Sequence, residues 1–130
     1  MSCILVVEDH AVVREPLARL LRFEGYRTLC AGNGNEALAA LQDNTVDLIL
    51  LDLMMPKKDG GALLEQLRAD PGWRALPVIL LTGVIEGSLL DRARELRVEH
   101  ILYKSRFTID ELFARIREQL AGKSVPATSA

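Results

Sequence analysis

Polar residues that can bind a phosphate or a divalent cation directly follow four of the five short apolar runs in this sequence. They are Glu8 with Asp9, Asp52, Thr82 and Lys104. Three carboxylates gathered in one place repel one another unless a cation joins them. An all-oxygen site of this kind suits Mg²⁺, and the sequence offers no cluster of Cys and His residues that would favour zinc.

The same residue types can transfer a phosphoryl group. A carboxylate at such a site can attack phosphorus and form an acyl phosphate. A metal ion and an ammonium group then neutralise the charge on the transferring oxygens. Lys104 supplies the ammonium group, and Thr82 offers a hydroxyl that can hydrogen-bond the new phosphoryl group.

Alternating strands and helices must bring these residues together. The apolar runs, which lack polar alternation and so suggest strands buried on both faces, are 3–7, 28–31, 46–51, 78–81 and 100–103. Amphipathic patterns predict helices near 12–21, 36–41, 62–67, 89–96 and 112–120. We therefore expect an α/β fold, a doubly wound (βα)5 flavodoxin-like sandwich with a five-stranded parallel sheet in the order 2-1-3-4-5. Ligands of such sheets bind beyond the carboxyl ends of the strands, where the polar residues fall.

Several residues near these elements are better explained by structure than by chemistry. Asp47 precedes Asp52 by five residues on one strand, which puts it ~16 Å away at the opposite edge of the sheet. His10 is interpreted as a surface histidine at a helix start, in preference to a metal ligand or phosphohistidine. Trp73 is expected to pack over an apolar edge. Asn33 and Asp59 are candidate N-terminal caps of the second and third helices, and Asp110 lies near the start of the last helix. Gly25 is a candidate C-terminal stop for the first helix.

Composition limits the classes of protein that remain. The chain has 130 residues, 49% of them hydrophobic and 26% charged, with a net charge of −2. These values predict one globular domain at 1–121, a flexible tail or linker stub at 122–130, and no generally basic nucleic-acid surface. No apolar run is long enough to span a bilayer, and the acidic start is unlike a secretory signal, so we expect a cytoplasmic protein. Cys3 and Cys30 are then expected to be buried, reduced thiols.

Three sequence blocks and one lysine resemble the receiver domain of bacterial two-component response regulators over about residues 3–120. The blocks are ILVVED at 4–9, DLILLDLMMPKKDG at 47–60 and PVILLTG at 77–83, followed by Lys104. An Asp-x-x-Met-Pro-x-x-Asp-Gly block after an apolar strand, with an acidic pair upstream, is a specific signal.

The resemblance implies a role for each of these positions. Asp52 would be the phosphoacceptor, and Mg²⁺ would be held by Glu8, Asp9, Asp52 and the backbone carbonyl of Met54. Thr82 would be the switch hydroxyl and Lys104 the phosphate-pairing lysine. The donor would be a phosphohistidine on a sensor histidine kinase or phosphotransfer protein, or a small acyl phosphate.

The sequence departs from the family pattern at two places. The aromatic residue usually found three before the lysine is Ile101 here, while Tyr103 directly precedes Lys104. Positions 101 and 103 share one face of a strand, so Tyr103 can still contribute to the switch face. In the family the lysine is usually followed by proline, often through a cis peptide bond, but here Ser105 follows Lys104. A cis bond before serine would cost about 2.5–4 kcal/mol. We therefore expect a trans bond, or a cis bond retained under strain.

The leading hypothesis is therefore a phosphorylation switch. Phosphorylation would change the affinity of the domain for a downstream protein target or output domain. The binding face would be formed by helix 89–96, strand 100–103 and helix 112–120. A homodimer through the same face is an open alternative. A phosphate-independent (pseudo-receiver) binding module is the second hypothesis. An aspartyl-phosphate phosphatase is the third, but Met54 stands where such enzymes need a general acid. We expect no enzyme beyond self-catalysed phosphorylation and dephosphorylation, no direct contact with nucleic acid or membrane, and either a stand-alone regulator or the receiver of a longer chain.

Overall fold

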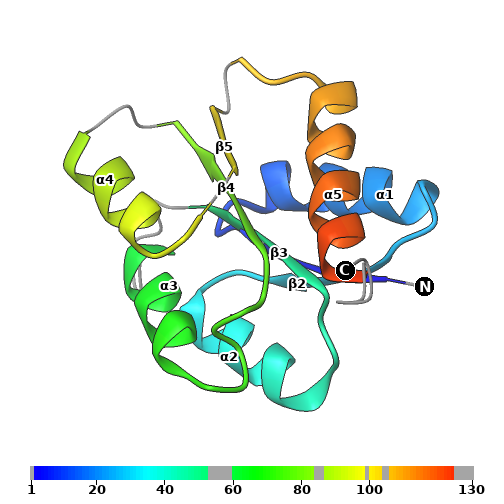
Figure 1. Ribbon diagram of the computed structural model, residues 1–130. Coiled ribbons are helices and arrows are strands. Elements are labelled where there is room, and N and C mark those ends of the chain that lie inside the picture. Colours follow the sequence, from blue (N-terminus) through cyan, green and yellow to red (C-terminus); the bar gives the residue numbers. More distant parts are fainter. Residues whose placement is uncertain (1, 53–59, 84–86, 99, 104–105, 125–130) are drawn as a thin grey trace.

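The computed structural model describes residues 2–52, 60–83, 87–98, 100–103 and 106–124. Strands and helices alternate along the chain (Figure 1). In order they are β1 (Cys3–Val7), α1 (Ala11–Phe23), β2 (Arg27–Ala31), α2 (Gly34–Asp43), β3 (Leu48–Asp52), α3 (Gly60–Ala69), β4 (Val78–Thr82), α4 (Gly87–Glu95), β5 (His100–Tyr103) and α5 (Ile109–Ser124).

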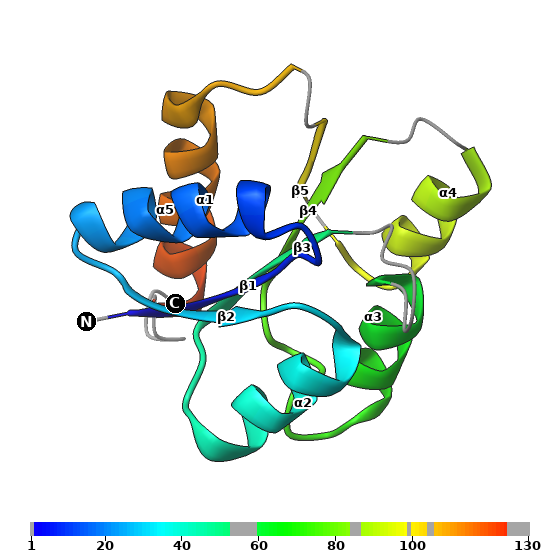
Figure 2. The same ribbon diagram turned by 180° about the vertical axis from the view of Figure 1, so that it is seen from behind.

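The five strands form one parallel sheet in the order β2-β1-β3-β4-β5, as predicted. Helices α1 and α5 cover one face and α2, α3 and α4 cover the other (Figures 1 and 2). This is the doubly wound, flavodoxin-like sandwich expected from the alternation of apolar runs and amphipathic segments.

Side chains of each strand alternate between two cores, one on each side of the sheet. Leu5, Ile49 and Leu80 belong to the core beneath α2 and α3, whereas Leu50 and Ile79 belong to the core beneath α1 and α5. Strands β1, β3 and β4 are buried along their whole length, which explains why their sequences show no polar alternation.

The third strand begins at Leu48, two residues later than predicted, because Asp47 bonds in a different way. The Asp47 N–H donates to the Cys3 carbonyl at 2.8 Å, and a carboxylate oxygen of Asp47 accepts the Cys3 N–H at 2.8 Å. The side chain thus takes the place of a backbone acceptor at the entrance to the sheet. The prediction that Asp47 is structural is confirmed.

Local signals in the sequence account for three of the helix ends. The Asn33 side chain accepts the Glu36 N–H at 2.9 Å, which confirms the predicted cap of α2. Gly25 follows α1 with φ of 100°, a left-handed conformation that favours glycine. At α5 the cap is the Thr108 hydroxyl, 3.1 Å from the Glu111 N–H.

The C-terminal helix is longer than the sequence predicted. Helix α5 continues to Ser124, so residues 122–124 are helical where a tail was predicted from residue 122. A glycine at 122 costs a helix only about 1 kcal/mol and does not by itself end it. Residues 125–130 and the predicted cap Asp59 lie outside the described residues.

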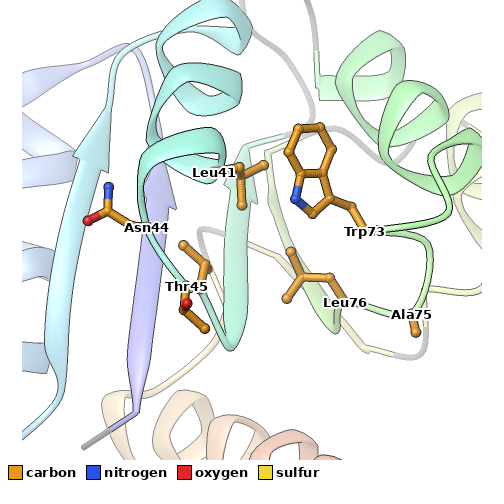
Figure 3. Close-up of a pocket in the computed structure, with 8 residues that line it drawn as sticks. Leu41, Asn44, Thr45, Trp73, Ala75 and Leu76 are labelled. Carbon is orange, nitrogen blue, oxygen red and sulfur yellow. The ribbon is translucent and has the colours of Figure 1, made fainter.

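Trp73 lies in the loop before β4, as predicted, and packs against the core cluster beneath α2 and α3. It borders a cavity of about 430 Å³ with Leu41 and Leu76, at the end of the sheet where the strands begin (Figure 3). Its half-buried indole therefore covers an apolar edge far from the carboxyl ends of the strands.

Arg68 ties three segments together at the same end of the sheet. Its guanidinium donates to the carbonyls of Leu96 at 2.7 Å, Arg74 at 3.0 Å and Leu76 at 2.7 Å. Burial, with a smaller contribution from Arg97, lowers the pKa of Arg68 from its usual value. This side chain joins α3 to the residue after α4 and to the segment before β4.

Both cysteines are free thiols; Cys3 is buried and Cys30 half-buried, and burial raises the pKa of each. Within the part of the chain that the structure describes, no helix is both long enough and apolar enough to cross a bilayer.

Candidate functional site

The strand register brings the polar residues to one edge of the sheet. Val7 pairs with Leu51, so the next residues along the two neighbouring strands are Glu8 and Asp52. Asp52 in turn pairs with Leu81, the residue before Thr82. Because hydrogen-bonded strands lie about 4.8 Å apart, these three residues occupy adjacent positions at the carboxyl edge.

Three of these polar side chains are buried. Glu8 is 2% exposed, Asp52 3% and Thr82 0%. An ionised carboxylate withdrawn from water needs hydrogen-bond donors or a cation to offset the loss of hydration. Two such carboxylates on neighbouring strands make this edge a site that attracts positive charge.

Backbone contacts fix the turn that carries the acidic pair. The Glu8 N–H donates to the Ala31 carbonyl at 3.0 Å, which extends the pairing of β1 with β2 by one residue. The Glu8 carbonyl accepts a hydrogen bond from the Arg14 guanidinium at 2.8 Å. Arg14 thus holds the start of α1 against the end of β1.

Asp9 and His10 complete an acidic cluster. The His10 Nδ1 atom lies 3.3 Å from Glu8 Oε2 and 3.2 Å from Asp9 Oδ1. One ligand atom from each of these three residues lies within 4.8 Å of the others. Asp9 Oδ1 is buried and has no hydrogen-bond partner among the described residues. The imidazole is 65% exposed, which confirms the predicted surface position at a helix start. Its contact with both carboxylates also fits the metal-ligand alternative that the sequence raised.

A hard divalent cation fits this cluster. Asp9 Oδ1 has no hydrogen-bond partner among the described residues and lies 3.2 Å from His10 Nδ1. Glu8 and Asp52 add buried carboxylates on two neighbouring strands. Mg²⁺ takes one or two protein carboxylates and completes its octahedron with water or phosphate oxygens. The carboxylate oxygens at this edge are of the type that Mg²⁺ binds.

The predicted switch face lies partly within the described residues. Tyr103 pairs with Thr82 across β4 and β5, and Ile101 pairs with Leu80. Ile101 packs against the core beneath α2 and α3, and both it and Tyr103 are half-buried. The aromatic residue opposite Thr82 is therefore Tyr103. Met54, Lys104 and the peptide bond before Ser105 lie outside the described residues, so the expectations for them stay predictions.

Comparison with known proteins assigns the family. The family model of the response regulator receiver domain matches residues 4–117. This chain belongs to the response regulator receiver domains. The transcriptional regulatory protein CpxR of Klebsiella pneumoniae is 45% identical over 119 residues, covering 90% of this chain and 48% of CpxR. The DNA-binding response regulator MtrA of Mycobacterium tuberculosis is 38% identical over 117 residues, covering 90% of this chain and 50% of MtrA.

A solved receiver domain has the same fold. The signal receiver domain of a signal transduction histidine kinase from Syntrophus aciditrophicus superposes with a TM-score of 0.86 at 33% identity, covering 96% of this chain and 94% of that one. This receiver domain spans about half the length of the curated relatives it matches. Receiver domains act in two-component systems, and phosphorylation and Mg²⁺ binding are features of the family.

Proposed function

We propose that this receiver domain accepts a phosphoryl group on Asp52, with Mg²⁺, from a phosphohistidine of a sensor histidine kinase or phosphotransfer protein. The observation that carries the proposal is the buried Asp52 on the strand next to an acidic pair whose Asp9 Oδ1 has no hydrogen-bond partner among the described residues. The phosphate-independent module gains no support from the comparisons with known proteins.

The chemistry follows from the position of Asp52. One of its carboxylate oxygens attacks phosphorus, the bond from phosphorus to the donor nitrogen breaks, and that nitrogen keeps the electron pair. The product is an acyl phosphate, which water later hydrolyses. Mg²⁺, when bound by Glu8, Asp9, Asp52 and the Met54 carbonyl, supplies charge neutralisation for the phosphoryl oxygens. Turnover of an external substrate is not part of this proposal.

Two further residues would bind the phosphoryl group. Thr82 is fully buried at the end of the strand next to Asp52, where its hydroxyl can turn toward a new acceptor. By resemblance, Lys104 would pair with a phosphoryl oxygen. The contacts of Thr82 and Lys104 with the phosphoryl group form only after phosphorylation. They therefore stabilise the conformation of the domain in which both side chains reach that group.

We further propose that this change is read at the surface of α4, β5 and α5. Tyr103 lies opposite Thr82 in the sheet, so the two residues are direct neighbours on β4 and β5. Ile101, two residue pairs earlier on the same strand, would take the smaller part. The reader would be a downstream protein target or an output domain, in the cytoplasm, and a second copy of the chain is a further candidate for the same face.

Intact-mass spectrometry after incubation with acetyl phosphate and Mg²⁺ tests the proposal. Wild-type protein should gain about 80 Da, the mass of one phosphoryl group, and EDTA should prevent the gain. Asp52→Asn should remain unmodified. An unmodified wild-type protein would refute the proposal.

Beryllofluoride, a phosphoryl mimic, tests the switch separately. Backbone amide NMR should show shifts at Tyr103 and along α5 that Asp52→Asn lacks. Shifts confined to the acidic pair and Asp52 would show that the phosphoryl group is bound but not read at this face.

A further inference from the structure

The imidazole of His10 turns toward the acidic pair instead of capping helix α1. His10 occupies the N-cap position of α1, but its side chain makes no capping hydrogen bond. Its backbone N–H instead donates to Glu8 Oε2 at 3.1 Å, which holds that carboxylate beside the ring. Because the ring is 65% exposed, an ion arriving from solvent can reach it.

The distances within the cluster are those of neighbouring ligands on one ion. With bonds of about 2.0–2.2 Å from metal to nitrogen or oxygen, adjacent ligands lie about 2.8–3.6 Å apart in octahedral or tetrahedral geometry. His10 Nδ1 lies 3.3 Å from Glu8 Oε2 and 3.2 Å from Asp9 Oδ1. All three ligand atoms lie within 4.8 Å of one another.

A shared proton accounts for only part of this arrangement. An N–H at His10 Nδ1 can serve the hydrogen bond to Glu8 Oε2, but Asp9 Oδ1 is then left as a buried acceptor without a hydrogen bond among the described residues. A cation between the three atoms would serve both carboxylates and the ring nitrogen together.

We propose that His10 is a nitrogen ligand of the receiver's cation site and, with Glu8 and Asp9, raises the affinity of that site for first-row transition dications such as Ni²⁺ or Zn²⁺ without a matching gain for Mg²⁺. The inference rests on the cation site of the proposed function and adds a ligand to it. Imidazole suits Ni²⁺ and Zn²⁺, whereas Mg²⁺ selects oxygen. The sequence argument against zinc required a Cys and His cluster, and the fold instead supplies one imidazole beside two carboxylates.

Calorimetric titration of tag-free protein with Ni²⁺, Zn²⁺ and Mg²⁺ tests this ligand directly. His10→Ala should weaken Ni²⁺ and Zn²⁺ binding by about tenfold or more and change Mg²⁺ binding by less than about twofold, because only the transition ions gain from nitrogen. His10→Gln should behave like His10→Ala, since an amide is a poor substitute for imidazole.

His100 provides the matched control, because the sequence contains two histidines. His100 lies on β5, an edge strand of the sheet that is not adjacent to β1 and its acidic pair. Its Nε2 atom lies 3.5 Å from Glu118 Oε2. His100→Ala should leave the binding of all three ions unchanged. Circular dichroism of each variant checks that the fold is retained.

NMR of the histidine rings gives a second measurement. Added Ni²⁺ should broaden the His10 ring signals through its unpaired electrons and leave those of His100 sharp. Equal Ni²⁺ affinity in wild type and His10→Ala, or a sharp His10 signal at saturation, would overturn the inference.

Phosphorylation of the wild-type protein with Mg²⁺ distinguishes this result from a failure of the proposed function. If Asp52 stays unmodified while Ni²⁺ binding still depends on His10, the proposed function fails and the ligand assignment stands. If Asp52 is modified and His10→Ala binds Ni²⁺ as tightly as wild type does, the proposed function stands and the ligand assignment fails.

Discussion

Aspartates flank strand β3 at both ends, Asp47 just before it and Asp52 as its last residue, and their surroundings differ. Asp47 is bonded to the neighbouring strand: its carboxylate accepts the Cys3 N–H at 2.8 Å and its own N–H donates to the Cys3 carbonyl at 2.8 Å. Asp52 lies on the strand next to the acidic pair Glu8 and Asp9. In that pair, Asp9 Oδ1 has no hydrogen-bond donor among the described residues.

The two aspartates mark a structural edge and a proposed functional edge of one sheet. At the edge where the strands begin, Arg68 and Asp47 bind backbone groups that would otherwise lack partners. At the edge where they end, acidic groups are gathered although they repel one another. Removing a charge should therefore lower the free energy of unfolding at the first edge and raise it at the second.

The largest change in stability is expected at Arg68. Arg68→Met keeps the apolar stem but removes the donors to three carbonyls, so the free energy of unfolding should fall by about 2–3 kcal/mol. Chemical denaturation followed by Trp73 fluorescence measures it. Arg68→Lys, which retains one charge and part of the bonding, should lose less; equal stability of Arg68→Met and wild type would contradict the structural role.

Asp47 is the next test of the structural edge. Asp47→Ala leaves the Cys3 N–H without its side-chain acceptor and should lower the free energy of unfolding by about 1–2 kcal/mol. Asp47→Asn is the matched control, since its amide oxygen can still accept that hydrogen bond. Urea denaturation midpoints of the three proteins should fall in the order wild type, Asp47→Asn, Asp47→Ala.

At the functional edge the sign should reverse. In EDTA, Asp9→Asn removes one of the mutually repelling charges and should raise the free energy of unfolding by about 0.5–1 kcal/mol. Added Mg²⁺ should stabilise the wild type and have little effect on this variant. A destabilised Asp9→Asn in EDTA would mean that the carboxylate has a structural partner.

Two glycines give the smallest contrast between the edges. Gly25, before β2, has φ of 100°, so Gly25→Ala should cost about 1 kcal/mol. Gly83, after β4, has open space where a Cβ would lie, so Gly83→Ala should raise stability by about 0.4–1 kcal/mol by restricting the unfolded chain. Thermal unfolding resolves both; a loss of stability in Gly83→Ala would contradict the expectation.

The sequence predicted the sheet and the edge where the site lies because both follow from periodicity. Fully buried strands such as β3 and β4 have continuous apolar sequences, and the residue after each run must then emerge at the carboxyl edge. The structural part played by Asp47 followed from strand length alone. These inferences needed only the rise per residue and the parallel arrangement.

Other features depend on contacts that spacing does not encode. The late start of β3 results from a carboxylate that bonds to another strand, and α5 continues past Gly122 to Ser124. The approach of His10 to both carboxylates depends on the backbone angles at the start of α1, where φ is −89° and ψ is 111°. The pairing of Tyr103 with Thr82 required the register of β4 and β5.

Residue-level mapping of the phosphoryl group tests the division between the two edges most directly. Wild type, Asp47→Asn and Asp52→Asn are incubated with acetyl phosphate and Mg²⁺, digested and sequenced by mass spectrometry. We predict modification at Asp52 in wild type and in Asp47→Asn, and none in Asp52→Asn. A phosphoryl group on Asp47, or one that survives the loss of Asp52, would contradict the account.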